Sequence, residues 1–265
     1  MTTRQINDEG AILVQHSDNG VSRITFNRPA QRNAMNRPAR VGLVNALDEC
    51  RGRAKVIVLT GNGPAFCAGV DLKEDPASTG DAEMDRRSEW SAVLEEIRRH
   101  PSVVIAAVNG FALGGGSTLL NISDLAIAAH EASIGMPEIG FGLYPVLAGP
   151  AVQLRLSPKR AAWLILTAER INGQTAAEWG LVNRSVPLAD LNNEVTALAK
   201  RIAGFDAVGL EAAKQALWKI PGEISEWTSA VEYAKNLAAD IRARSQAFDD
   251  GMSRFREGQR NPGQG

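Results

Sequence analysis

Two continuous apolar segments, each followed by a turn that contains glycine, restrict the fold of this chain more than any other feature. Residues 56–60 (VIVLT) precede the first turn, residues 63–72 (GPAFCAGVDL), and residues 103–108 (VVIAAV) precede the second, residues 110–117 (GFALGGGS). A strand that is apolar at successive positions suits a parallel sheet covered on both faces. The sequence therefore predicts an α/β core with both turns at strand ends.

The glycines of these turns favour one kind of ligand contact. Glycine lets a backbone N–H approach a ligand without a Cβ in the way, and the first N–H groups of a helix are unpaired and favour negative charge. Two such N–H groups directed at one point would polarise a carbonyl group and stabilise an oxyanion. The structural alternative is that the glycines only permit close packing of a strand and a helix.

Up to about residue 139 the pattern alternates between strands and helices. A helix is expected to begin at Asn36, with Pro38 just inside it, and the apolar stripe of a second helix, residues 90–97, ends before Pro101. We expect strands at residues 11–14, 21–26, 55–60, 102–108 and 124–129.

Beyond residue 149 the pattern becomes mostly helical. Ser157 is a predicted cap, followed by Pro158 at the first helical position. Apolar residues recur at helical spacing over 188–202 and again over 224–241, and one short strand is expected at 181–186.

Composition and charge exclude several classes of protein. The 265 residues contain 29 Lys plus Arg and 30 Asp plus Glu, a net charge of −1, without a concentrated basic run. Nucleic acid and an anionic membrane are therefore not expected as partners. No apolar segment approaches the roughly 20 residues that span a bilayer, and the first residues lack a signal-peptide pattern. We expect a soluble, cytoplasmic protein.

Several familiar site motifs are missing from the sequence. Neither a P-loop nor a GxGxxG fingerprint occurs, and no GxSxG accompanies Ser117. Cys50 and Cys67 have no metal-binding or redox spacing, and the three histidines lie far apart along the chain. We therefore expect no metal site, no nucleotide hydrolysis and no serine triad.

Three segments together resemble the crotonase, or enoyl-CoA hydratase/isomerase, superfamily in order and spacing. They are residues 27–35 (NRPAQRNAM), 66–74 (FCAGVDLKE) and 109–116 (NGFALGGG). Residues 124–127, 136–140 and 176–183 agree as well, so the resemblance runs from about Ile12 to Arg260. It implies a crotonase-like α/β spiral of β-β-α repeats over residues 1–200. A C-terminal helical trimerisation region, residues 201–265, would then pack against neighbouring subunits in a homotrimer or a dimer of trimers.

The resemblance also implies a set of catalytic residues. The N–H groups of Val70 and Gly115 would hold the carbonyl of an acyl-CoA thioester. Hydratases of the family usually place two glutamates around the water, and the matching positions here are Thr118 and Glu138. Glu138, with its pKa raised by burial, would act as base and then as acid. The structural alternative for Glu138 is an acid at a helix start, stabilised by the helix dipole.

Two branches of the family resemble a site with one glutamate. In Δ3,Δ2-enoyl-CoA isomerases one glutamate moves a proton, and in feruloyl-CoA hydratase/lyases one glutamate works with a hydroxyl residue and a tyrosine. Thr118 and Tyr233 match the latter pair, whereas the tryptophan that follows that branch's glutamate is Phe141 here. Tyr233 is equally suited to packing on its helix.

The CoA portion of the substrate would bind mainly to the backbone of one loop. The resemblance implies contacts with CoA from the loop of residues 30–35 and from the first turn, and one more from an aromatic residue of a neighbouring subunit. In the loop the expected residues are Ala30, Arg32 and Ala34, and in the first turn they are Ala68, Asp71 and Leu72. Phe255 is the expected aromatic residue. Coenzyme A is part of the substrate in this family, so no separate cofactor is expected.

The sequence leaves several functions open. The main hypothesis is hydration of an α,β-unsaturated acyl-CoA, by a hydratase or a hydratase-lyase, with Val70 and Gly115 stabilising the enolate and Glu138 transferring the proton. The alternatives are a Δ3,Δ2-enoyl-CoA isomerase, thioester hydrolysis or decarboxylation at the same oxyanion site, and a catalytically degenerate binding or scaffold homologue.

Overall fold

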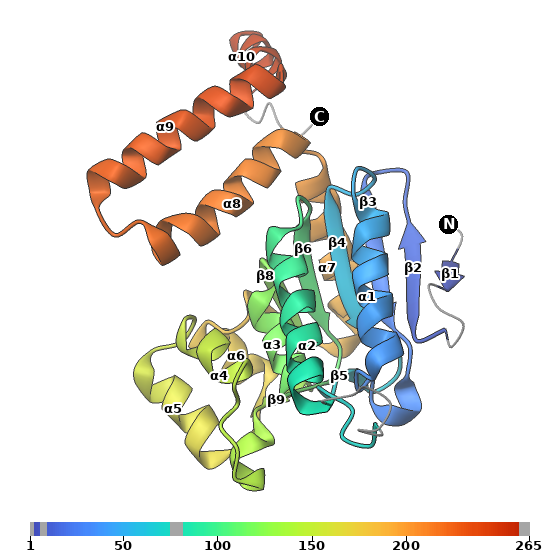
Figure 1. Ribbon diagram of the computed structural model, residues 1–265. Helices are drawn as coiled ribbons and strands as arrows, with labels where there is room; N and C mark the ends of the chain where they lie inside the picture. Colours follow the sequence, from blue (N-terminus) through green and yellow to red (C-terminus); the bar gives the residue numbers. More distant parts are fainter. Residues whose placement is uncertain (1–2, 6–9, 75–81, 260–265) are drawn as a thin grey trace.

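Two β-sheets form the core of the protein (Figure 1). The computed structural model describes residues 3–5, 10–74 and 82–259. The larger sheet contains, in spatial order, β1 (Thr3–Gln5), β2 (Ile12–His16), β3 (Val21–Phe26), β4 (Val56–Gly61), β6 (Val103–Val108), β8 (Leu125–Ala129) and β11 (Arg184–Val186). The smaller sheet contains β10 (Ile171–Asn172), β9 (Ser133–Gly135), β7 (Phe111–Leu113) and β5 (Ala65–Cys67).

Helices cover the sheets and dominate the second half of the chain. They are α1 (Arg37–Cys50), α2 (Ala82–Arg99), α3 (Gly115–Ile122), α4 (Ala148–Gln153), α5 (Pro158–Thr167), α6 (Gly173–Trp179), α7 (Leu188–Ala203), α8 (Ala207–Glu223), α9 (Trp227–Arg244) and α10 (Ala247–Arg256), with 3₁₀ turns η1 (Pro29–Gln31) and η3 (Pro137–Phe141). None of the described helices combines the length and the apolar character needed to cross a membrane.

One structural unit is repeated along the chain. A strand of the larger sheet is followed each time by a short strand of the smaller sheet, β4 by β5, β6 by β7 and β8 by β9. Neighbouring strands of successive units pair in parallel, and such pairing needs a crossover segment. Here α2 and α3 supply the first two crossovers. This arrangement confirms the predicted spiral of β-β-α repeats.

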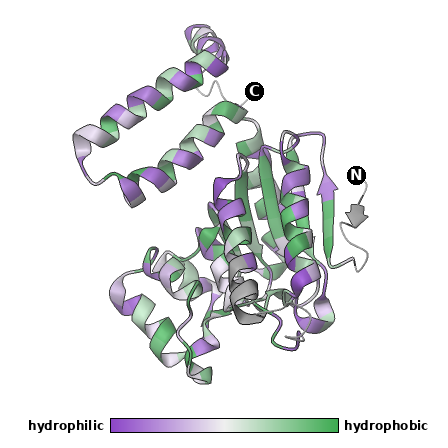
Figure 2. Cartoon of the chain, in the orientation of Figure 1, coloured by the Kyte–Doolittle hydropathy of each residue, from purple (hydrophilic) through white to green (hydrophobic). Residues whose placement is uncertain are grey.

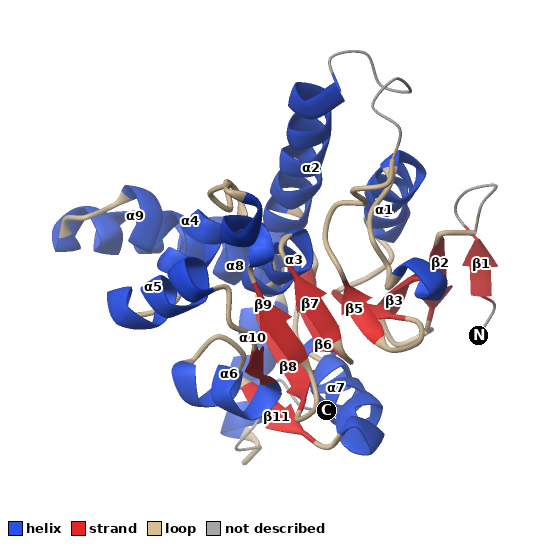
Figure 3. Cartoon of the chain, turned by 90° about the horizontal axis from the view of Figure 1, so that it is seen from below, coloured by secondary structure: helices blue, strands red, loops and turns tan. Residues whose placement is uncertain are grey.

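The two continuous apolar segments form the centre of the larger sheet. Every residue of β6 is buried, and so are the first four of β4. Helices α1 and α2 lie side by side over one face, and α7 packs against the other (Figures 1 and 3). Figure 2 shows the central strands as the most hydrophobic part of the chain. The prediction of strands covered on both faces is confirmed.

The boundaries of three predicted elements differ from the structure. The predicted strand at 181–186 is shortened to β11, because the N–H groups of Leu181 and Val182 donate to the Ala176 carbonyl in a turn that ends α6. Ser157 precedes α5, but its hydroxyl makes no capping hydrogen bond. Ile224 lies outside α9, and no residue of α9 is buried.

Helices α8, α9 and α10 extend away from the sheets (Figure 1). The predicted boundary at residue 200 falls within α7, which packs on the larger sheet, so the extended part begins with α8. It exposes several large apolar side chains, namely Leu217, Trp227, Phe248, Met252 and Phe255.

A buried lysine attaches α8 to the core. The Lys214 ammonium donates to the carbonyls of Ile97 and Ser102 and pairs with the Asp124 carboxylate, each at 2.9 Å. Burial lowers the pKa of Lys214, while the Asp124 charge acts in the opposite direction. The indole N–H of Trp218 donates to the other oxygen of Asp124. The carboxylate is thus held by two side chains of α8.

We predict that Lys214→Met lowers the free energy of unfolding by about 3 kcal/mol, because it leaves the buried Asp124 carboxylate without its cation. Chemical denaturation measures the change. Arg244→Ala is the matched control: it removes an exposed pairing with Glu211, and we expect it to cost less than about 1 kcal/mol. Equal losses in the two variants would contradict this account.

Candidate active site

The two glycine turns touch each other through their backbones. Gly69 has φ +91°, and a Cβ atom there would lie 2.8 Å from the Leu113 carbonyl oxygen and 3.0 Å from the Gly115 nitrogen. A Cβ at Gly116 would lie only 1.9 Å from the Cys67 carbonyl oxygen. The close packing considered as an alternative is therefore present at Gly116, where no side chain fits.

The N–H group of Val70 is left without an acceptor in the described structure because the residues on either side of it, Gly69 and Asp71, make the hydrogen bonds with Met35. Val70 forms an isolated parallel bridge with Met35, in which the Met35 N–H donates to Gly69 O at 2.8 Å and the Asp71 N–H donates to Met35 O at 3.1 Å. Successive N–H groups of an extended chain alternate in direction, so the Val70 N–H is directed away from Met35. Within the described residues it has no acceptor.

The N–H group of Gly115 is free for a different reason. Gly115 is the first residue of α3, after Gly114 with φ +52° and ψ −115°. The Gly114 N–H donates to Gly135 O, and Gly114 O accepts from the Thr118 N–H, both at 3.0 Å. The Gly115 N–H has no acceptor in the described part of the chain. A helix start and a lone β-bridge thus each contribute one unpaired donor beside the contact of the two turns.

Glu138 lies next to Gly114. It belongs to η3, directly after β9, and a Cβ atom at Gly114 would lie 2.8 Å from its Oε1 atom. Its Oε2 atom is buried and has no hydrogen-bond partner among the described residues. Burial raises the pKa of Glu138, and a hydrogen bond with its own backbone acts in the opposite direction. A carboxyl group stabilised mainly by a helix dipole would have a lowered pKa instead.

Thr118 also adjoins Gly114. Its buried hydroxyl donates to the Gly114 carbonyl oxygen at 3.3 Å from the first turns of α3. Gly115, Thr118 and Glu138 therefore all lie around one glycine, and Gly69 places Val70 next to them. Four of the five predicted catalytic positions are brought together.

The fifth position, Tyr233, lies elsewhere in the chain. It belongs to α9, where its ring contacts the Lys219 ammonium at 5.2 Å. Figure 1 shows α9 and α10 extending from the end of the molecule opposite to β5 and β9. Phe255, on α10, is 58% exposed. Within one chain neither side chain is part of the site.

The expected CoA-binding positions form a connected loop. The Ala68 N–H donates to Arg32 O at 3.0 Å, and the Arg28 guanidinium bonds both Ala34 O and the Asp71 carboxylate. Ala30 lies exposed in η1, and Leu72 is 76% exposed beyond the first turn. The Asp71 carboxylate is occupied by Arg28, so this side chain supports the loop.

Asn33 holds this loop in an unusual backbone conformation. Arg32 and Asn33 have φ values of 51° and 58°, a region that residues other than glycine rarely adopt. The Asn33 side chain donates to Asn62 O and Ala65 O and accepts from the Arg28 N–H, at 3.0, 2.7 and 2.8 Å. The loop is thereby attached to both ends of the segment that leads into the first turn.

Trp90 belongs to the predicted apolar stripe of α2 and makes a second contact that the stripe does not predict. A Cβ at Gly115 would lie 3.0 Å from the Trp90 ring, whose buried Nε1 atom has no partner in the described residues. The ring thus packs against one of the two donor residues. Helical periodicity gives no signal for such a contact, because it depends on where α2 crosses α3.

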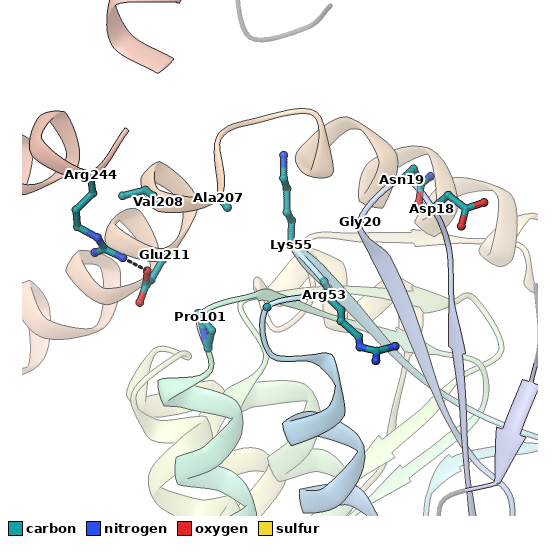
Figure 4. Close-up of a pocket in the computed structure, with 12 residues that line it drawn as sticks. Asp18, Asn19, Gly20, Arg53, Lys55, Pro101, Ala207, Val208, Glu211 and Arg244 are labelled. Atoms are coloured by element: carbon teal, nitrogen blue, oxygen red, sulfur yellow. Dashed lines mark hydrogen bonds and ion pairs between the residues drawn. The ribbon is translucent and has the colours of Figure 1, made fainter. Parts of the chain in front are cut away.

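A separate cavity of about 720 Å³ lies at the amino ends of the central strands (Figure 4). Its lining includes Gly20, Lys55 and Pro101, which precede β3, β4 and β6, together with Val208 and Arg244 from α8 and α9. None of the predicted site residues lines it. Ligands of parallel sheets bind at the carboxyl ends of strands, where the two turns lie.

We predict that Gly69→Ala lowers the free energy of unfolding by about 2 kcal/mol, because alanine is strained at this φ and its methyl group meets backbone atoms. Turnover should fall about 100-fold as the Val70 N–H is displaced. Gly222→Ala is the control, since a Cβ there meets nothing within 4 Å. Wild-type turnover in a stably folded Gly69→Ala protein would exclude a role for this donor.

The raised pKa of Glu138 predicts how its replacement changes stability with pH. The folded chain holds this proton more tightly than the unfolded chain, so stability falls as the pH rises from the ordinary value of 4.5 through the raised value. Glu138→Gln should therefore raise the midpoint of thermal unfolding at about pH 7 and change it little at about pH 4. Glu178→Gln, at an exposed position, should change it at neither pH. A lower midpoint for Glu138→Gln at neutral pH would contradict the assignment.

Comparison with known proteins agrees with this geometry. The hydroxycinnamoyl-CoA hydratase-lyase of Pseudomonas fluorescens is 35% identical over 248 residues, covering 90% of this chain and 89% of the relative. The 1,2-epoxyphenylacetyl-CoA isomerase of Escherichia coli is 30% identical over 253 residues, covering 92% and 94%. The crystal structure of an enoyl-CoA hydratase from Mycobacterium smegmatis superposes with a TM-score of 0.88 at 28% identity, covering 94% and 97%. The family model for enoyl-CoA hydratase/isomerase matches residues 16–262, and the chain belongs to this family.

Proposed function

We propose that this protein adds water to an α,β-unsaturated acyl-CoA. The observation that carries the proposal is the pair of unpaired N–H groups, at Val70 and Gly115, beside the contact of the two glycine turns, with the Glu138 carboxyl group next to them. The hydratase-lyase relative at 35% identity supports the same type of reaction.

In this proposal the two N–H groups bind the thioester carbonyl oxygen. Addition of water at the β carbon moves an electron pair toward that oxygen, and the resulting enolate is stabilised by the donors. Each donor contributes about 3 kcal/mol to the transition state in comparable sites. Since both belong to the main chain and are fixed by the packing of the turns, they need no rearrangement during the reaction.

Glu138 moves the proton. As a carboxylate it takes a proton from the water whose oxygen bonds to the β carbon, and as a carboxylic acid it returns a proton to the α carbon when the enolate collapses. The partnerless, buried Oε2 atom and the raised pKa suit a group that changes protonation during turnover. The resemblance matches Thr118 to the first of the family's two glutamates and Glu138 to the second, and in this proposal the Thr118 hydroxyl orients the water.

CoA binds along the loop of residues 30–35 and the first turn. The Arg32 and Arg170 guanidinium groups both lie over the Phe111 ring, at 5.0 and 5.8 Å from its centre. They provide positive charge for the phosphate end of the substrate. No further cofactor takes part in this proposal.

Tyr233 and Phe255 reach a site only in an assembly of several copies. Helices α9 and α10 bury none of their residues within one chain. We infer that they pack against neighbouring subunits in a homotrimer or a dimer of trimers, so that Phe255 contacts a neighbour's CoA and Tyr233 a neighbour's acyl group.

The second candidate is a Δ3,Δ2-enoyl-CoA isomerase. Among the residues that the structure describes, Glu138 is the one carboxyl group found beside the two donors. This favours an isomerase, because double-bond migration needs only one proton-transfer group and no water. A degenerate binding homologue is the candidate of another class. The near-zero net charge gives little support to RNA binding.

Incubation of the purified protein with a 2-enoyl-CoA, a 3-enoyl-CoA and a hydroxycinnamoyl-CoA tests the proposal. We expect the 2-enoyl-CoA to gain the mass of one water, and Glu138→Gln to lower kcat by about 10²- to 10⁴-fold. Glu178→Gln is the control. Conversion of only the 3-enoyl-CoA would establish the isomerase instead. Absence of turnover with intact CoA binding would favour the binding homologue.

A further inference from the structure

We propose that Arg40 is a positioning residue that sets the separation of the two N–H donors; this inference rests on the proposed function. Arg40 lies in the first turn of α1 and is 1% exposed. Its guanidinium group bonds one backbone carbonyl and two carboxylates. These three contacts lead to both donor residues.

The first contact reaches Val70. The Arg40 Nη1 atom donates to Met35 O at 3.0 Å. The same carbonyl accepts the Asp71 N–H, and the Met35 N–H donates to Gly69 O. The bridge between Met35 and Val70, which leaves the Val70 N–H unpaired, is therefore stabilised by a charged donor on the Met35 carbonyl.

The second contact reaches Gly115. The Nε and Nη2 atoms of Arg40 donate to one oxygen of Glu89 at 3.1 and 3.0 Å. Glu89 precedes Trp90 on α2, and the Trp90 ring lies against Gly115. Arg40 thus fixes the position of α2 relative to α1. Because the Trp90 ring packs against Gly115, the position of α2 also affects the position of the Gly115 N–H.

The third contact closes the arrangement at the end of the first turn. Arg40 Nη1 pairs with Glu74 Oε2 at 3.0 Å, and Glu74 Oε1 accepts the Arg37 backbone N–H at 2.6 Å. Glu74 follows the turn that carries Val70. A planar guanidinium with several fixed donors can hold these three acceptors at once, whereas a lysine ammonium is a point charge on a flexible chain.

A role in stability alone does not account for this arrangement. Burying a charged group is costly, and apolar residues of similar size often give equal stability. Here the buried charge joins α1, α2 and the first turn at one point. Misplacement of a reacting group by about 1 Å can reduce turnover about 100-fold, so a group that fixes the distance between the two donors affects the rate.

The test compares Arg40→Lys with Arg37→Lys. Arg37 pairs with the same Glu89 at 2.8 Å, but its side chain is half-exposed and makes no bond with Met35. For each protein we would measure kcat, KM, the thermal midpoint and the infrared C=O frequency of a bound 2-enoyl-CoA labelled with ¹³C at the thioester carbon. That frequency reports the polarisation of the carbonyl by the two donors.

We expect the wild type and Arg37→Lys to lower the C=O frequency equally. Arg40→Lys should lose part of that shift and about 10- to 100-fold in kcat, with a smaller change in KM because the two donors act mainly in the transition state. A folded Arg40→Lys protein with wild-type frequency and kcat would overturn this inference alone. A wild type that fails to shift the carbonyl would overturn the proposed function and this inference together.

A second variant covers the case in which Arg40→Lys does not fold. The triple variant Arg40→Met, Glu74→Gln, Glu89→Gln removes all three charges, so no buried charge is left unpaired. It keeps an apolar side chain in the core but gives up the bond with Met35 O. The same loss of frequency shift and of kcat is expected, and wild-type values for both would overturn the inference.

Discussion

The direct backbone contact between the two glycine turns is the constraint on which the site depends. Gly69 lies against Leu113 O and the Gly115 nitrogen, and Gly116 lies against Cys67 O at a distance that excludes any side chain. The contact follows from the repeated strand pairs, since β5 and β7 pair in parallel and their carboxyl ends meet. The two unpaired N–H groups lie beside this contact; one results from the bridge between Met35 and Val70 and the other from the start of α3.

Side chains contribute by holding this backbone in place and by supplying a proton carrier. Arg28, Asn33 and Arg40 bond the loops next to the first turn, whereas Glu138 lies against Gly114 with one oxygen unsatisfied. An unsatisfied buried oxygen destabilises the folded state. The surrounding sheets, with β6 buried throughout, offset that cost. Arg28, Asn33 and Arg40 therefore hold the backbone of the site in place, whereas Glu138 is the residue proposed to move the proton.

The sequence alone predicted the parts of the structure that have a clear period or a clear motif. The continuous strands β4 and β6, the cap at Asn36 and the order of the glycine turns were all recognisable. The strands of the smaller sheet were missed because two or three residues are too short to show alternation. Trp90 and Arg40 were also missed, since their roles depend on how α1, α2 and α3 cross. Tyr233 was recognised by spacing along the chain, which carries no information on where α9 lies.

The role of Asn33 depends on the amide group of its side chain. Its amide nitrogen donates to two carbonyl oxygens, Asn62 O and Ala65 O. Deamidation would replace that nitrogen with an oxygen of a carboxylate, which only accepts hydrogen bonds, and would set negative charge against both carbonyls. Conversion to aspartate, a change of about one mass unit, would thus open the loop next to the first turn and disturb the expected CoA-binding positions on it.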